Sequence, residues 1–159
     1  MKKLFVSLLC AGMCVCACEN GGENPLLSNW DAPYGIPPFD KIEPAHYMPA
    51  YKVAMEQLRS EIDSIVNNPE EPTFENTIVA YDNSGKLLSR ISAVFSSDNG
   101  VNSNEQLRTI SKELSPLLSN LFSDISMNEG LFKRIKSVYD RRDSLGLEPD
   151  QYRLVTLVY

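Results

Sequence analysis

The spacing of apolar residues is the feature that most limits the fold of this chain. Across residues 104–127 the apolar positions are Leu107, Ile110, Leu114, Leu117, Leu121 and Ile125. They recur every three or four positions, which places them on one side of an α-helix and excludes a half-buried strand. Polar residues fill the intervening positions, so the other side of this helix is expected to face water.

The same helical spacing of apolar residues recurs in the other segments that follow residue 43. We expect further helices over residues 43–68, from residue 73 to about residue 97, over residues 128–145 and from residue 148 onward. Polar turns separate them, NNPEEP at residues 67–72 and SDNGVNSN at residues 97–104. No strand pair stands out, and the sequence therefore predicts an all-α fold.

Prolines and glycines indicate where these helices begin, bend or end. Pro49 marks either the true start of the first long helix or a kink in it, and Gly85 interrupts the apolar face of the second. Pro116 predicts a kink about one turn before its own position. Gly146 is typical of a C-terminal cap, and Pro149 suits the first turn of the last helix.

Residues 25–44, PLLSNWDAPYGIPPFDKIEP, combine dense proline with aromatic side chains. Proline at this density excludes a long helix or a central strand. The apolar content is nevertheless too high for a solvated linker. We expect an extended strap whose Trp30, Tyr34 and Phe39 pack onto the helices that follow.

The N-terminus has the pattern of an export signal. Two lysines precede a short apolar run, which is about half the ~20 residues that a membrane-spanning helix needs. The run leads into VCAC, where small residues precede Cys18, and this resembles the lipobox of bacterial lipoproteins. We expect a signal peptide over residues 1–17, acylation of Cys18 and a flexible tether over residues 18–24. An ordinary secretory signal, cleaved after a small residue, is the alternative.

All the cysteines lie within this N-terminal segment, at Cys10, Cys14, Cys16 and Cys18. The rest of the chain therefore has no disulfide framework, thiolate metal ligand or cysteine nucleophile. The formal net charge is −6 at pH 7, and removal of Lys2 and Lys3 with the signal lowers it by two, to −8. Such an acidic chain, without a dense run of Lys and Arg, is not expected to bind nucleic acid or anionic lipid through its own surface. The acyl group would hold it at the membrane.

The stretch PTFENTI, residues 72–78, places polar residues where a helix is expected to begin. Thr73 stands just before the apolar periodicity, and its hydroxyl can accept from the free amide of Asn76 in an N-cap. Glu75 in the first turn favours the positive end of the helix dipole. Since no second carboxylate stands three or four residues after Glu75, a helix start is favoured over a general-acid role.

Longer stretches carry a family resemblance. NPLLSNWDAPYGIPPFDKIEPAHYMPAY (residues 24–51), PTFENTI and ELSPLLS (residues 113–119) resemble the N-terminal region of the thimet-type zinc oligopeptidases, in their bacterial peptidyl-dipeptidase and oligopeptidase A branches. The resemblance covers essentially all of the chain after the signal. It implies the N-terminal helical region of a larger, two-lobed peptidase whose deep channel admits short peptides.

The resemblance also implies a zinc centre elsewhere in that family. Its zinc is held by two histidines of an H-E-x-x-H motif and a glutamate from the next helix, and the glutamate of the motif activates water. The peptidyl-dipeptidase members release two residues from a substrate's free C-terminus. This chain has one histidine and no H-E-x-x-H. We therefore expect no catalytic or metal-binding residue in it, with zinc belonging to the full-length enzyme.

The other candidate site residues have plainer interpretations. His46 could ligate zinc only together with scattered carboxylates, so a partly exposed histidine near a helix start is favoured. The run DRRD, residues 140–143, is either a substrate clamp or, as we favour, a solvated helix face with local ion pairs. An aromatic set either lines a channel wall or, in the favoured interpretation, packs in the core; it consists of Trp30, Tyr34, Tyr47 and Tyr51.

Two functions fit these observations. The first is the channel-wall part of an exported, membrane-anchored zinc peptidyl-dipeptidase, placed by the resemblance in the periplasm or outer membrane of a Gram-negative cell. The second is a standalone helical lipoprotein that binds peptides or a partner through the 107–125 stripe. Five of the last six residues are apolar and no cap follows them, which favours a chain cut before its catalytic part.

Overall fold

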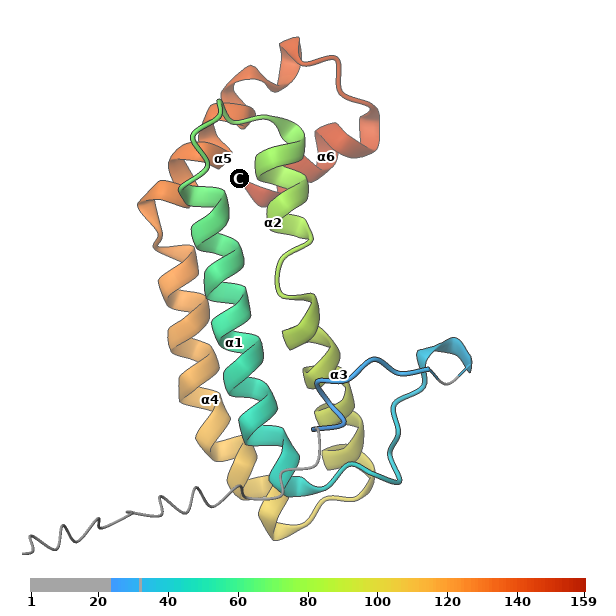
Figure 1. Ribbon diagram of the computed structural model, residues 1–159. Coiled ribbons are helices and arrows are strands. Elements are labelled where there is room, and N and C mark those ends of the chain that lie inside the picture. The colour runs from blue at the N-terminus through green and yellow to red at the C-terminus, as the bar shows by residue number, and fades with distance from the viewer. Residues whose placement is uncertain (1–23, 32) are drawn as a thin grey trace, which may run out of the picture.

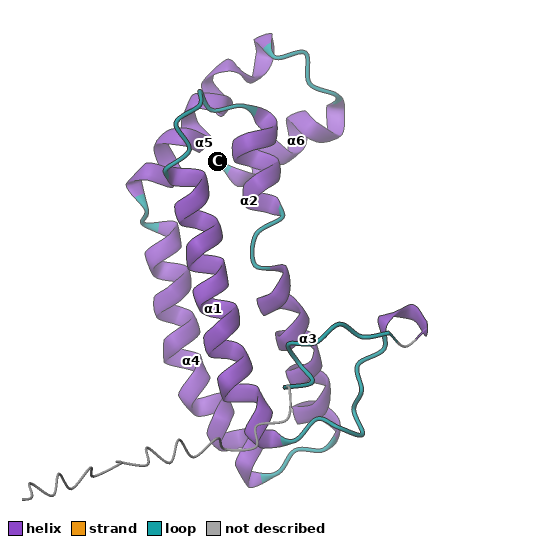
Figure 2. Ribbon diagram, in the orientation of Figure 1, coloured by secondary structure: helices purple, strands orange, loops and turns teal. Residues whose placement is uncertain are grey.

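The computed structural model of the chain describes residues 24–31 and 33–159. The expected signal peptide, the lipidation residue Cys18 and almost all of the tether lie outside the described residues. Within the described part every regular element is a helix and no strand is present (Figure 2). The predicted all-α class is therefore confirmed.

Two long helices lie side by side and carry most of the length of the molecule (Figure 1). They are α1, Pro44–Val66, and α4, Glu105–Ser126. α1 begins at Pro44, so of the two alternatives for Pro49 the helix start is excluded, and Pro49 lies inside the helix. Both helices run through an internal proline, because each proline removes only one backbone hydrogen bond while the buried face continues on both sides of it.

The second predicted helix is in fact divided. It consists of a π-helical turn η2, Phe74–Val79, the short α2, Ala80–Asp82, and then α3, Lys86–Val101. The division lies at Gly85, whose φ of 71° is in the left-handed region that only glycine adopts readily. The Gly85 amide donates to Glu61 Oε2 on α1 over 2.7 Å, which fixes the break against the neighbouring helix.

α3 also extends further than its sequence indicates, since residues 97–101 were expected in a turn and are helical instead. The composition of this stretch favours a turn, but a tertiary contact opposes it. The Tyr47 hydroxyl on α1 donates to Asp98 Oδ2 over 2.9 Å. We attribute the extra turn of α3 to this anchor, which overrides local preference.

The remaining helices cross the end of the long pair (Figure 1). α5, Glu129–Arg141, continues into the 3₁₀ turn η3, Arg142–Ser144, and α6 spans Pro149–Val158. α6 packs on α5 and on η2, while α5 also packs on α1. Gly146 has a φ of 64° after η3, and Pro149 opens α6, both as predicted.

The proline-rich strap meets the helices through one aromatic residue rather than three. Trp30 packs against the core, with the Arg90 guanidinium 4.5 Å from its ring centroid, and Arg90 also donates to the Leu26 carbonyl. Tyr34, in the 3₁₀ turn η1 (Pro33–Gly35), and Phe39 are exposed. The expectation that all three aromatic groups pack is wrong for these two, because the turn at Tyr34 directs the chain away from the helices.

A single apolar core joins the helices. On α4 the predicted stripe is buried at Leu107, Leu114, Leu121 and Ile125, partly buried at Ile110 and 40% exposed at Leu117. Tyr47 and Tyr51 on α1 both meet the Phe95 ring of α3 edge-on, at centroid distances of 4.9 and 5.9 Å. Such pairs add to the burial that holds α1 against α3.

None of the helices in the described part combines the length with the apolar character that crossing a membrane would need.

We expect Gly130→Ala to destabilise the chain although alanine favours helices by about 1 kcal/mol. A Cβ at Gly130 would lie 2.5 Å from Val66 Cγ1, so α5 must shift away from α1. Overpacking of this kind costs about 1–3 kcal/mol. Urea unfolding measures the loss. The double variant Gly130→Ala/Val66→Ala should recover part of it, and equal losses with and without Val66 would contradict the proposed overlap.

Candidate functional site

The PTFENTI stretch forms the predicted helix start. The Thr73 hydroxyl accepts from the Asn76 amide over 3.0 Å, and the Asn76 side-chain oxygen accepts from the Thr73 amide over 2.8 Å. This reciprocal pair satisfies donors that the first turn leaves free. Glu75 is exposed in that turn. The cap prediction is confirmed, although the turn that follows is π-helical rather than α-helical.

Asn76 has a second role that its position in the sequence does not reveal. Its side-chain amide donates to the Glu71 carbonyl, and its side-chain oxygen accepts from Arg134 Nη2 over 3.2 Å. Arg134, on α5, is 9% exposed. Its Nη1 donates to the carbonyls of Asn68 and Glu70 over 2.8 and 3.1 Å. The Arg134 guanidinium therefore holds the 67–72 turn, the start of η2 and α5 together.

A sequence signal for Arg134 exists but is easily missed. The residue lies on the apolar stripe of α5, three positions after Leu131 and four before Val138, both of which are buried. An arginine at a core position requires acceptors. Here neutral backbone carbonyls and an amide supply them, which marks a structural clamp rather than a substrate-binding cation.

His46 takes part in another helix start. Its Nδ1 accepts from the backbone amide of Glu43 over 3.0 Å, at the N-terminus of α1. The side chain is partly exposed. Across the described residues no cluster of three or more His, Cys, Asp and Glu side chains is arranged to hold a metal ion. The donor set of a zinc site is thus not assembled in this part of the chain.

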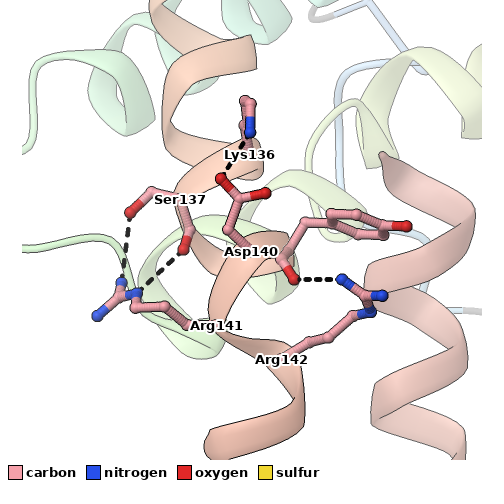
Figure 3. Close-up of polar contacts among 6 residues, drawn as sticks. Lys136, Ser137, Asp140, Arg141 and Arg142 are labelled. Carbon is pink, nitrogen blue, oxygen red and sulfur yellow. Dashed lines mark hydrogen bonds and ion pairs between the residues drawn. The ribbon is translucent and has the colours of Figure 1, made fainter.

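The DRRD run forms local contacts together with contacts to other segments. Asp140 pairs with Lys136 at 2.6 Å, as can be followed in Figure 3. Arg142 donates to the Tyr139 carbonyl. In the same view Arg141 donates back to Ser137. It also donates to the Pro72 carbonyl over 2.6 Å. The ion pair was expected. The reach of Arg141 to the 67–72 turn was not, and it reinforces the Arg134 clamp.

Arg142 completes this cluster through aromatic rings. Its guanidinium carbon lies 3.8 Å from the Tyr139 ring centroid, and its Nε donates to the Tyr152 hydroxyl on α6. That hydroxyl in turn donates to Asp143. The hydrogen bond with Tyr152 raises the pKa of Arg142 above its ordinary value. Arg142 is thereby engaged with α6, as Arg141 is with α5 and the 67–72 turn, which disfavours a free substrate clamp.

The predicted aromatic set is split between core and surface. Tyr47 and Tyr51 are buried, Trp30 is half-buried and Tyr34 is fully exposed. Burial raises the pKa of Tyr47, and the hydrogen bond to Asp98 raises it further. The core interpretation therefore holds for Tyr47, Tyr51 and Trp30 and is wrong for Tyr34.

We expect the stability of the chain to fall above pH 10 partly through Tyr47. An ordinary tyrosine pKa is 10.0, and the folded value is higher, so above pH 10 the unfolded chain releases this proton first and unfolding becomes easier. Tyr47→Phe should cost about 1 kcal/mol at pH 7 by loss of the Asp98 hydrogen bond. It should also make the decline above pH 10 shallower. Urea unfolding between pH 7 and pH 11 measures both, and an unchanged decline would contradict the assignment.

A hollow of about 570 Å³ lies between the N-terminal ends of α1 and α4. Its lining includes Glu43, Met48, Glu105, Ile110 and Glu113. The titratable groups among its lining residues are the carboxylates of Glu43, Glu105 and Glu113.

Comparison with known proteins connects this framework to peptidases. No protein-family model matches the chain. Over 136 residues, 86% of its length, it is 40% identical to the dipeptidyl carboxypeptidases of Salmonella typhimurium and Escherichia coli. Over 117 residues, 74% of its length, it is 32% identical to oligopeptidase A of Escherichia coli. The matches cover 20% and 17% of those relatives, so the chain spans about a fifth of their length.

Proposed function

Because most of this chain is homologous to a region of the dipeptidyl carboxypeptidases and oligopeptidases A, we propose that it forms the N-terminal helical part of an exported zinc peptidase that releases dipeptides from the C-termini of short peptides. The observation that carries the proposal is the 40% identity over 86% of the chain. The stretches that resemble this family include the helix start at Thr73 and the first turns of α1.

In this proposal the chain contributes channel-wall structure and no bond-breaking group. Its polar side chains support that role, because Thr73 and Asn76 close a helix start and the buried Arg134 binds backbone carbonyls. With a single histidine, the residues present do not fit a zinc centre. Zinc and its H-E-x-x-H motif would belong to the catalytic part of the enzyme.

A hybrid enzyme tests this function. In the hybrid, this chain from residue 19 to residue 159 replaces the homologous region of the Escherichia coli dipeptidyl carboxypeptidase. We expect dipeptide release within about tenfold of that enzyme, a barrier change near 1.4 kcal/mol. The same enzyme with the region deleted is the control and should be inactive. A folded, monodisperse hybrid without activity would contradict the proposal and favour a helical binding protein instead.

We also propose that Cys18 anchors the protein to a membrane as a lipoprotein. The VCAC sequence at the end of the apolar run supports this, and acyl chains would supply about 0.8 kcal/mol for each buried methylene. Cys18→Ser should abolish labelling by a radioactive fatty acid and move the protein to the soluble fraction of cells. Cys14→Ser is the matched control and should leave both unchanged. Retained labelling in Cys18→Ser would contradict the assignment.

A further inference from the structure

A groove of about 570 Å³ opens where α1 lies between α4 and the break that separates α2 from α3. α1 supplies Leu58 and Ile62 to its floor, and α4 supplies Ile125. Leu88 and Ser89 of α3 line the third side. Figure 1 shows α1 running between α4 and α3, with the α2–α3 break facing it. The groove is thus bordered by three separate helices.

The Gly85 break shapes this groove. A Cβ at Gly85 would lie 3.4 Å from Leu58 Cδ1, so the backbone of the break sits directly on the α1 side chain. Its amide is held by Glu61 Oε2 of the same helix. The hydrogen bond and the left-handed φ together turn the chain beside the groove, and the floor residues Leu58, Ile62 and Ile125 are themselves buried. The groove is therefore built into the fold and does not result from a loosely placed loop.

Phe122 lies at the rim of the groove, and its large apolar side chain is exposed. The side chain lines the groove and is 52% exposed. An apolar ring beside an apolar floor is the kind of surface that marks an interaction site when it remains open. The rim also carries the Asp82 carboxylate and the Ser89 and Ser92 hydroxyls, and no lysine or arginine lines it. An occupant would therefore bring apolar anchors to the floor and donors or a positive charge to the rim.

We propose that this groove is the docking site for an apolar segment of the peptidase region that lies outside this chain. The inference rests on the proposed function. The relatives extend far beyond the 20% of their length that matches, so a large partner region exists in each of them. Three helices around an apolar floor offer the shape that helix-in-groove recognition uses. The occupant inserts apolar side chains between Leu58 and Phe122 and places a donor near Asp82.

Thiol labelling tests the proposal without disturbing the floor. Because the chain after Cys18 contains no cysteine, single cysteines report their own positions. Ser89→Cys lies on the groove wall, and Ser60→Cys lies on α1 two residues from Leu58 and Ile62, hence on the opposite side of that helix. Both serines are exposed in the chain. Each variant is labelled in the free chain from residue 19 and in the hybrid, whose host part has its own cysteines replaced.

The expected result is about tenfold or more slower labelling of Ser89→Cys in the hybrid than in the free chain, with less than about twofold change for Ser60→Cys. Dipeptide release by the same hybrid reports the proposed function separately. An active hybrid in which Ser89→Cys labels as fast as in the free chain would overturn the docking site and leave the function standing. Protection in a folded but inactive hybrid would support the docking site and contradict the function.

A second measurement applies if the hybrid does not fold. The purified host region without its homologous part is added to the free chain, and the rate of Ser89→Cys labelling is measured as its concentration rises. Saturable slowing supports the docking site, and the Phe122→Asp change should abolish it. Leu117→Asp, at a 40% exposed position elsewhere on α4, is the matched control and should leave it intact. No slowing at any concentration at which the host region is monodisperse would overturn the proposal.

Discussion

Replacing Arg134 with methionine is expected to lower the free energy of unfolding by about 3 kcal/mol. The guanidinium is 9% exposed and donates to the carbonyls of Asn68 and Glu70 and to the side-chain oxygen of Asn76. Methionine has similar length and fills the space, but it removes the donor to the Asn68 and Glu70 carbonyls, while the Asn76 oxygen still accepts from the Thr73 amide. Hydrogen bonds from a charged donor carry more stability than neutral ones, so the loss should exceed that of an ordinary single bond.

Urea unfolding of Arg134→Met measures the loss in the free energy of unfolding. Two further variants show whether the loss comes from the clamp. Arg153→Met removes an exposed arginine from α6 and should change stability by no more than about 0.5 kcal/mol. Asn76→Ala, combined with Arg134→Met, should show a coupling energy of about 1 kcal/mol between the two side chains. If Arg134→Met were no worse than Arg153→Met, the clamp would contribute nothing and the tie between α5 and the 67–72 turn would need another cause.

Truncating Leu121 to alanine should destabilise the chain by about 2–5 kcal/mol, whereas the same change at Leu117 should cost about 1 kcal/mol or less. Both leucines belong to the apolar stripe of α4. Leu121 is fully buried and Leu117 is 40% exposed. Helix propensity changes equally in the two variants, so their difference isolates core packing.

The comparison is made by urea or thermal unfolding of both variants under one set of conditions. A change in the midpoint without a change in the dependence on denaturant would show that stability alone has changed. Similar losses in the two variants would contradict the packing of α4, because they would mean that Leu117 is buried as deeply as Leu121.

Much of the fold follows from the periodicity of apolar residues. The bounds of α4 differ from the expected segment by only one residue at each end. The prediction is this close because the apolar stripe is long and Asn104 caps the helix by accepting from the Leu107 amide. The start of α6 at Pro149 was also expected, since proline suits a first turn. These elements are governed by local rules.

The differences arise where tertiary contacts decide. Gly85 can be accommodated within a helix, and the sequence does not show that Glu61 binds its amide and holds the chain in a left-handed turn. The polar residues 97–101 favour a turn, but Asp98 is held by Tyr47 from a helix far away in the sequence. A local pattern contains neither contact.

The candidate site shows the same contrast. Thr73 and Asn76 form the predicted cap because both partners lie within one turn. The link from Asn76 to Arg134 spans 58 positions and depends on how α5 packs, so spacing cannot reveal it. His46 was expected near a helix start and lies there, where its ring accepts from the Glu43 amide within the same turn.

We propose above that this chain supplies structure to a peptidase and does not itself break peptide bonds. The most direct measurement is release of C-terminal dipeptides from a short peptide by the free chain in the presence of zinc, followed by mass spectrometry. We expect no release above that of zinc in buffer, and no zinc retained by the chain after dialysis. Dipeptide release that grows with the concentration of the chain would contradict it, since an active site would then lie within these 159 residues.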